Sequence, residues 1–252
     1  MSFIVALRKE IMEQSRTHRL LIVAVVFTAF GLLSPLMARY MPEIFSTIPG
    51  MEQFTALMPP PTTADAIAQY VKNISQFGVL LAVLLGMGSV AQEKERGTAA
   101  MLLSKPMTRA SFILAKFGGL MFTFVAGMAL AGMGGYAYTW LLFEPLNMGG
   151  WLALNGMLLL YMLVYAALSL FFSTLVRSQA AAGGMSLGVL ILLGLIGAVP
   201  SLSEKLPAEL LNWGAQISLG AADPRWTALI VSLAVVIAAV TAAWLILRRQ
   251  EL

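Results

Sequence analysis

Residues 74–91 read ISQFGVLLAVLLGMGSVA, and residues 92–109 continue as QEKERGTAAMLLSKPMTR. The first segment contains no charged residue and is about as long as a helix that crosses the hydrocarbon core of a bilayer. The second segment begins with a charge cluster at residues 93–96. Because charged side chains are costly inside a membrane, this cluster ends the apolar run at a membrane surface. The stretch therefore predicts a membrane-spanning helix followed by a connection at the membrane surface.

The composition of the whole chain indicates that this span is one of several. Apolar residues make up 59% of the 252 residues and charged residues only 11%, whereas ordinary soluble domains contain about 25% charged residues. Only lipid accommodates so much apolar surface without a polar shell. The chain contains no cysteine, which excludes disulfides, thiolate nucleophiles and cysteine metal sites. A polytopic membrane protein is the class that remains.

Five further apolar segments have the length of a membrane span. The six predicted spans are residues 20–38, 74–91, 117–140, 151–176, 180–200 and 226–247. Only three residues, Arg177 to Gln179, separate the fourth span from the fifth, which predicts a tight helical hairpin at a membrane surface. The predicted fold class is therefore an all-α membrane protein with six transmembrane helices, and residues 1–252 form a single transmembrane domain.

The distribution of basic residues predicts the orientation of these spans. Connections on the cytoplasmic side of a membrane carry an excess of Lys and Arg. Twelve of the sixteen basic residues fall on the side that holds both termini: Arg8, Lys9, Arg16, Arg19, Lys94, Arg96, Lys105, Arg109, Lys116, Arg177, Arg248 and Arg249. The other side holds Arg39, Lys72, Lys205 and Arg225. We therefore expect both termini to be cytoplasmic.

Residues 1–19 precede the first span and form a predicted amphipathic helix. Helical spacing places Phe3, Ile4, Leu7 and Ile11 on one face, with charged residues elsewhere around the helix. A helix of this kind lies in the membrane interface. An alternative is a basic leader whose only role is to fix the orientation of the first span.

The second connection, residues 92–116, is the longest one predicted on the cytoplasmic side. Gly97 ends the preceding helix, Thr98 caps a new one, and Pro106 ends that helix in turn. The result is a short isolated helix that exposes Met101, Leu102 and Leu103 unless a partner covers them. An apolar knob surrounded by charge predicts a docking element. The alternative is a solvated linker whose basic residues only fix topology, but such a linker would not need the two leucines.

The same connection resembles that of a known family. Its Glu-x-Gly-Thr, Leu-Leu, Pro-x-x-Arg and Lys pattern is similar to the one found between the second and third spans of ABC-2 type permeases, the membrane subunits of ATP-binding-cassette exporters. The residues that carry the pattern are Glu95, Gly97, Thr98, Leu102, Leu103, Pro106, Arg109 and Lys116. The resemblance implies an N-terminal interfacial "elbow" helix over residues 1–19, six spans, and a cytoplasmic coupling helix within residues 92–116.

The resemblance also implies the partners. In that family the coupling helix docks on the ATP-binding subunit, and the predicted docking residues here are Glu93, Glu95, Arg96, Gly97, Thr98, Met101, Leu102, Leu103, Pro106 and Arg109. The expected assembly contains two ATP-binding subunits, which hold ATP and Mg²⁺, and a second permease subunit, as a homodimer in contact with membrane lipids. We expect it in a bacterial or archaeal cytoplasmic membrane.

The family resemblance further implies a translocation path. Spans two and five line the interface between the two permease subunits in the family, which assigns the path and dimer interface here to Val83, Met87, Gly183, Gly184, Gly188 and Gly194. Small residues at these positions serve close helix packing within one chain equally well, so both interpretations are open. The uncharged spans favour a hydrophobic or amphipathic substrate.

The sequence lacks the residues that several other functions require. No lysine follows a glycine, so the G-x-x-x-x-G-K-[ST] nucleotide-binding loop is absent, and we predict a permease without its own ATPase site. We predict no catalytic residue, no cofactor and no metal site in this chain, and no nucleic-acid partner. An ATP-independent carrier or a non-transporting membrane scaffold remains an alternative, although ion-coupled carriers keep ionisable residues at mid-membrane and no predicted span has one there.

Overall fold

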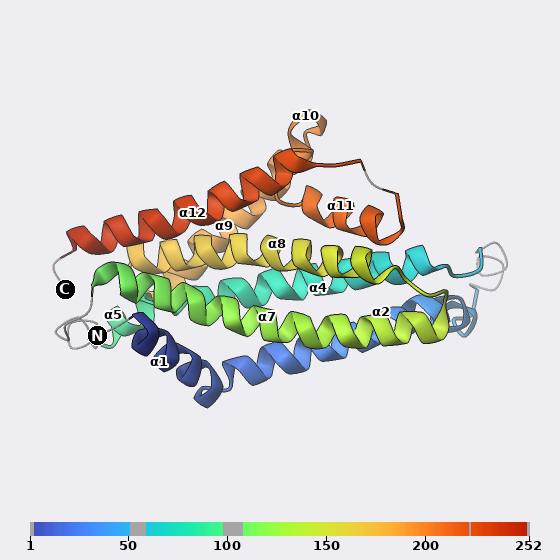
Figure 1. Ribbon diagram of the computed structural model, residues 1–252, viewed down its shortest axis with the longest axis horizontal. Coiled ribbons are helices and arrows are strands. Elements are labelled where there is room, and N and C mark those ends of the chain that lie inside the picture. Colours follow the sequence, from blue (N-terminus) through green and yellow to red (C-terminus); the bar gives the residue numbers. More distant parts are fainter. Residues whose placement is uncertain (1–2, 51–58, 98–107, 222, 251–252) are drawn as a thin grey trace.

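The computed structural model describes residues 3–50, 59–97, 108–221 and 223–250, and every regular element in them is an α-helix (Figure 1). Six helical segments in these ranges are long and apolar enough to cross a membrane. They are α2 (Arg19–Ser46), α4 (Thr63–Met87) with α5 (Ala91–Glu95), α7 (Arg109–Leu142), α8 (Met148–Leu175), α9 (Gln179–Gly197) and α12 (Trp226–Arg249). The predicted all-α class with six spans is therefore confirmed.

Three shorter helices lie around this bundle. The first, α1 (Phe3–Arg16), precedes the spans, and α10 (Pro200–Ser203) and α11 (Glu209–Ser218) connect α9 to α12. Figure 1 places α1, α5, the start of α7 and the end of α12 at one end of the bundle, whereas α10 and α11 lie in the opposite half. The residues on both sides of the predicted coupling segment are thus gathered at the end where α1 begins.

Several helices extend beyond the apolar runs that predicted them. The first span was predicted to end at residue 38, but α2 continues to Ser46, and α4 begins at Thr63 rather than near residue 74. The start of α4 is determined by a capping box, in which the Asp65 carboxylate accepts a hydrogen bond from the Thr62 backbone N–H at 2.8 Å. Apolar runs predict where lipid surrounds a helix, while caps determine where the helix begins.

Close packing of α2 against α7 forms one half of the core. A methyl group added at Gly31 would lie 2.7 Å from the carbonyl oxygen of Ala131, so the two backbones are nearly in contact there. A methyl group at Gly127 would lie 2.7 Å from the Val23 side chain. Small residues permit this approach, which strengthens packing where no hydrophobic force drives helices together in lipid.

Polar contacts between spans form a second set of links. The Asn73 side chain donates to the Ser34 hydroxyl at 3.0 Å, linking α4 to α2, and both residues are buried. The Tyr70 hydroxyl donates to the Asn155 Oδ1 at 2.7 Å, linking α4 to α8. The Ser169 hydroxyl of α8 donates to the Val83 carbonyl of α4 at 3.0 Å. These pairs satisfy buried polar groups, which would otherwise be costly in an apolar environment.

The α2–α7 contact can be tested by adding one methyl group. We expect Gly31→Ala to destabilise the protein by about 1–3 kcal/mol, because the two backbones would have to separate. The measurement is the apparent melting temperature of the detergent-solubilised protein. Gly156→Ala in α8 is the matched control, since a methyl group there would meet no atom within 4 Å. Equal melting temperatures for the two variants would contradict the close contact.

Candidate functional site

The helix that enters the predicted docking connection is interrupted between α4 and α5, and one hydroxyl group of α8 stabilises the interruption. The Ser173 Oγ accepts hydrogen bonds from the backbone N–H groups of Val90 and Ala91, at 2.9 and 2.8 Å. The same hydroxyl donates to the Met87 carbonyl at 2.9 Å. A hydroxyl has one donor and two acceptor positions, so all three are used. The position of α5 is therefore determined by α8.

Four consecutive polar residues of α5 then contact different parts of the bundle. Gln92 accepts from Arg19 of α2 at 3.0 Å, and Glu93 accepts from Lys116 of α7 at 2.6 Å. The other two residues contact elements later in the chain. We call α5 together with its contacting residues the α5 junction; these contacting residues are Arg19, Lys116, Ser173, Thr174, Gln179 and Gln250.

The contacts of Lys94 and Glu95 complete the junction. The Lys94 ammonium donates to the Thr174 carbonyl at the end of α8 at 2.5 Å, and to the Gln250 side chain, just after α12, at 2.7 Å. The Glu95 carboxylate accepts from the Gln179 backbone N–H, at the start of α9, at 3.4 Å. One turn of helix thus contacts elements that lie far apart in the sequence.

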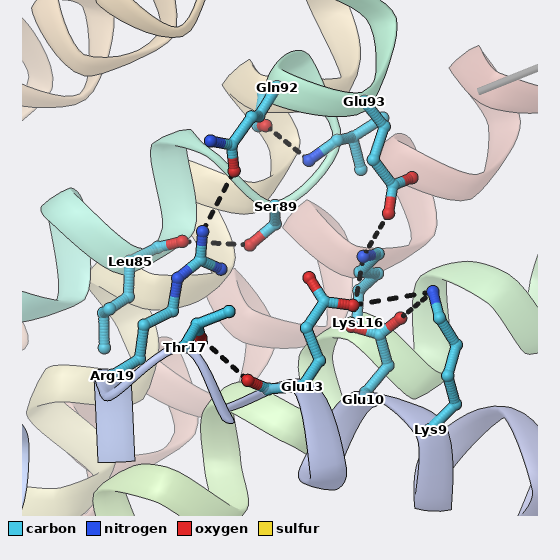
Figure 2. A network of polar contacts seen from close by, with 12 residues as sticks. Lys9, Glu10, Glu13, Thr17, Arg19, Leu85, Ser89, Gln92, Glu93 and Lys116 are labelled. Carbon is cyan, nitrogen blue, oxygen red and sulfur yellow. Dashed lines mark hydrogen bonds and ion pairs between the residues drawn. The ribbon is translucent and has the colours of Figure 1, made fainter. Parts of the chain in front are cut away.

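A buried ion-pair network links the junction to α1, as Figure 2 shows. Lys116 lies between two carboxylates, 2.6 Å from Glu93 and 3.1 Å from Glu10 of α1. The side chains of Lys116 and Glu10 are only 4% and 6% exposed. Removing one partner of such a buried pair leaves an uncompensated charge, which is strongly destabilising. The network therefore fixes α1 to α5 and α7.

Three carboxylates approach one another in this network. Oxygen atoms of Glu10, Glu13 and Glu93 lie within 4.8 Å of one another, which is close enough to consider them as cation ligands. Lys116 already forms ion pairs with Glu10 and Glu93, and Lys9 lies 3.5 Å from Glu13. Since lysine ammonium groups supply the compensating charge, we interpret the group as an ion-pair network.

Helix α1 contacts the bundle mainly through a polar face. Its buried residues are Ala6, Glu10 and Gln14, whereas Phe3 and Ile4 of the predicted apolar face are exposed. A Cβ atom at Gly119 of α7 would lie 3.1 Å from the Glu10 side chain, so the lack of a side chain at this one position lets α1 lie close to α7. The sequence predicted an amphipathic helix. Phe3 and Ile4 of its apolar face are available to lipid, whereas Leu7 and Ile11 are half-buried and Leu7 lies against Gly118 of α7. The interfacial location itself stays a prediction.

Arg109 determines how the last span ends. Its Nη1 atom donates to the backbone carbonyls of Leu247, Arg248 and Gln250, at 2.5, 2.8 and 2.9 Å. The last carbonyl groups of a helix have no partner within the helix, and a basic side chain can satisfy them. Arg109 thus connects the start of α7 to the end of α12.

The predicted docking residues fall into three groups. Glu93 and Arg109 are bonded inside the chain, as described above, and Glu95 has the single contact with α9. Arg96 and Gly97 are exposed, and Gly97 ends the helix with a φ of 69°, as the sequence predicted. The predictions for Thr98, Met101, Leu102, Leu103 and Pro106 lie outside the described residues. The docking surface as a whole therefore stays a prediction.

The predicted path residues also differ from one another. Val83 is buried within the chain, and a Cβ atom at Gly183 would lie 2.6 Å from the Met87 sulfur, so these positions pack α4 against its neighbours. Beside Gly184, Gly188 and Gly194, added Cβ atoms would meet nothing within 4 Å. Close packing within one chain therefore accounts for Gly183 alone among these four glycines. The role of all six predicted residues in a translocation path or dimer interface stays a prediction.

Sequence reasoning missed most of the junction. As site residues, Lys116 was identified only through a family pattern, and Glu10, Gln92, Lys94, Ser173 and Gln250 were not selected. The one available signal was a pair of carboxylates, Glu10 and Glu13, within an otherwise basic amphipathic segment. Serine and glutamine carry no comparable signal, because their partners lie about 80 to 160 residues away in the chain.

Comparison with known proteins identifies relatives of this chain. The sequence profile of a family described as ABC-2 family transporter protein matches residues 4–210. The chain is also 29% identical over 222 residues to the uncharacterized transmembrane protein YxlG of Bacillus subtilis (strain 168). That alignment covers 84% of this chain and 83% of the relative. The family match over residues 4–210 includes α1 from its second residue, the α5 junction up to Gln179, and the spans as far as α9.

The buried ion pairs can be tested by removing the shared lysine. We expect Lys116→Met to destabilise the protein by about 3–5 kcal/mol, because Glu10 and Glu93 would lose the buried ammonium group that lies between them. Thermal unfolding in detergent measures the effect. Lys9→Met is the matched control, because the Lys9 side chain is 40% exposed and exposed ion pairs contribute little.

A second substitution separates lost charge from lost packing. Adding Glu10→Gln to Lys116→Met removes one of the two uncompensated carboxylates, so we expect the double variant to regain part of the lost stability. A double variant that is less stable than Lys116→Met would contradict the ion-pair interpretation.

Proposed function

This chain belongs to the ABC-2 family of transporter proteins, and from that membership we propose that it is the permease subunit of an ATP-driven exporter. It is an integral membrane protein, and members of its family are the membrane components of transporters rather than enzymes. In the proposed assembly, two ATP-binding subunits bind ATP and Mg²⁺, and two permease subunits form the path. The charge distribution of the connections supports placing the α5 junction on the cytoplasmic side.

The observation that carries this proposal is the α5 junction. A partner that moves residues 98–107 must act through the two helices that flank them, α5 and α7. Because α5 is bonded to α2, α7, α8, α9 and the residue after α12, a displacement of α5 would reach every span. Chains of packed and hydrogen-bonded elements of this kind carry coupling between distant sites.

The exposed face of α9 supports the location proposed for the path. Gly184, Gly188 and Gly194 leave open space on this helix, and Ile191, Leu192 and Leu195 beside them are exposed. A second copy of the chain could approach closely at such a face. The apolar character of the face favours a hydrophobic or amphipathic substrate.

The docking step can be tested at the two leucines of the predicted coupling helix. We expect Leu102→Asp combined with Leu103→Asp to abolish assembly with the ATP-binding subunit, because the charges would have to be buried in an apolar contact. The permease is co-expressed with the ABC ATP-binding subunits of its own genome, and co-purification and ATPase activity are measured. Arg248→Asp, an exposed position in the last turn of α12, is the control. An intact, active complex with both aspartates would defeat the docking hypothesis.

The proposed dimer face can be tested by cross-linking, because the native chain contains no cysteine. Gly188→Cys is expected to yield a covalent dimer under mild oxidation in native membranes, since the two copies of α9 would approach there. Gly156→Cys on α8 is the control, because this glycine also faces open space. Denaturing electrophoresis without reductant measures the dimer. A dimer from Gly156→Cys but none from Gly184→Cys or Gly188→Cys would refute this face.

A further inference from the structure

One residue contacts the helices on both sides of residues 98–107. Gln250 follows the end of α12, and its side-chain oxygen accepts a hydrogen bond from Lys94 of α5 at 2.7 Å. Its backbone carbonyl accepts from Arg109, the first residue of α7, at 2.9 Å. Lys94 lies before residues 98–107 and Arg109 lies after them. Gln250 therefore connects the two flanks of this segment through two independent hydrogen bonds.

The remaining polar groups of Gln250 are also bonded. Its side-chain nitrogen donates to the Thr174 carbonyl at 3.1 Å, and its backbone N–H donates to the Leu247 carbonyl at 3.3 Å. Lys94 donates to the same Thr174 carbonyl, so Lys94, Thr174 and Gln250 form a closed triangle. A residue with four polar groups and four partners is held in one position, although it lies outside any helix.

We propose that Gln250 is a positioning residue that fixes the separation of α5 and α7 at the two ends of residues 98–107. Through the same contacts it would make the end of α12 part of the unit that moves when a partner displaces this segment. The inference rests on the proposed function for its role in coupling. The positioning itself is a property of the permease alone.

The chemistry of the triangle explains why an amide suits this position. Lys94 requires an acceptor and the Thr174 carbonyl requires a donor, and a glutamine side chain presents both. A carboxylate would keep the acceptor for Lys94 but would place a negative charge against the Thr174 carbonyl. An alanine would remove both side-chain contacts and leave only the backbone bonds to Arg109 and Leu247. We therefore expect glutamine to hold α5 and α7 at the most uniform separation, glutamate at a less uniform one and alanine at the least uniform one.

The test measures the distance between the two flanks. The native chain contains no cysteine, so spin labels can be attached at two introduced cysteines. Arg96→Cys is an exposed position just after α5, and Ala110→Cys is a half-buried position at the start of α7. Pulsed electron paramagnetic resonance on the detergent-solubilised permease then gives the distance distribution. Gln250→Ala is expected to replace a single narrow distance with a broad distribution, and Gln250→Glu is expected to broaden it less.

Two further variants keep the result interpretable. Arg249→Gln is the matched control, since it changes an exposed neighbour whose side chain takes no part in the triangle, and it should keep the narrow distance. If Gln250→Ala does not fold, Gln250→Asn replaces it, because a side chain one methylene shorter cannot reach both partners. A narrow, unshifted distance in the Gln250 variants would overturn the positioning role.

A second measurement separates this inference from the proposed function. Subunit binding and subunit-dependent ATPase activity are measured for the Gln250 variants without the two cysteines, and Gln250→Ala should keep subunit binding. A broadened distance in a permease that binds no ATP-binding subunit would support the positioning role and overturn the proposed function. An unchanged distance with normal subunit-dependent ATPase activity would overturn only the positioning role.

Discussion

The arrangement of this bundle depends on satisfying four consecutive polar side chains at the point where an apolar helix leaves the membrane. In lipid, no hydrophobic force draws one apolar helix to another, so polar contacts and close packing determine how spans assemble. The polar residues of α5 contact four other spans and the residue after α12, and Lys116 lies buried between two carboxylates. This one short helix therefore determines the relative positions of the spans at its end of the bundle.

Elsewhere in the bundle the helices are held by a different kind of contact. Gly31 and Gly127 let α2 and α7 approach until side chains and backbone touch, and isolated pairs such as Asn73 with Ser34 link neighbouring spans. Glycine contacts are short-ranged and apolar, whereas the α5 junction consists of charged and hydrogen-bonded groups. The two sets complement each other, because the first brings helix faces together and the second fixes which helix ends meet.

The sequence predicted the spans well and the junction poorly, for a physical reason. A bilayer requires about 20 apolar residues for each helical crossing, and this requirement is visible in any window of the chain. The partners of Ser173 and Gln250 lie about 80 to 160 residues away, and no local pattern indicates them. Glu93 and Arg109 illustrate the difficulty, because their charges suggested an external partner while their contacts lie inside the chain. Charge shows that a partner is needed, but the fold determines which partner is used.

The strengths of the junction contacts suggest where movement would occur under the proposed function. Separating Lys116 from Glu10 or Glu93 would leave buried charge uncompensated, at a cost of about 3–5 kcal/mol, so α1, α5 and α7 should move as one body. The contact between Glu95 and the start of α9 is different, because it is a single exposed hydrogen bond of 3.4 Å. α9 is also among the least buried of the candidate spans. A force applied beside α5 would therefore displace α4 relative to α9 more readily than it would disrupt the ion-pair network, and α4 and α9 are the two helices assigned to the path.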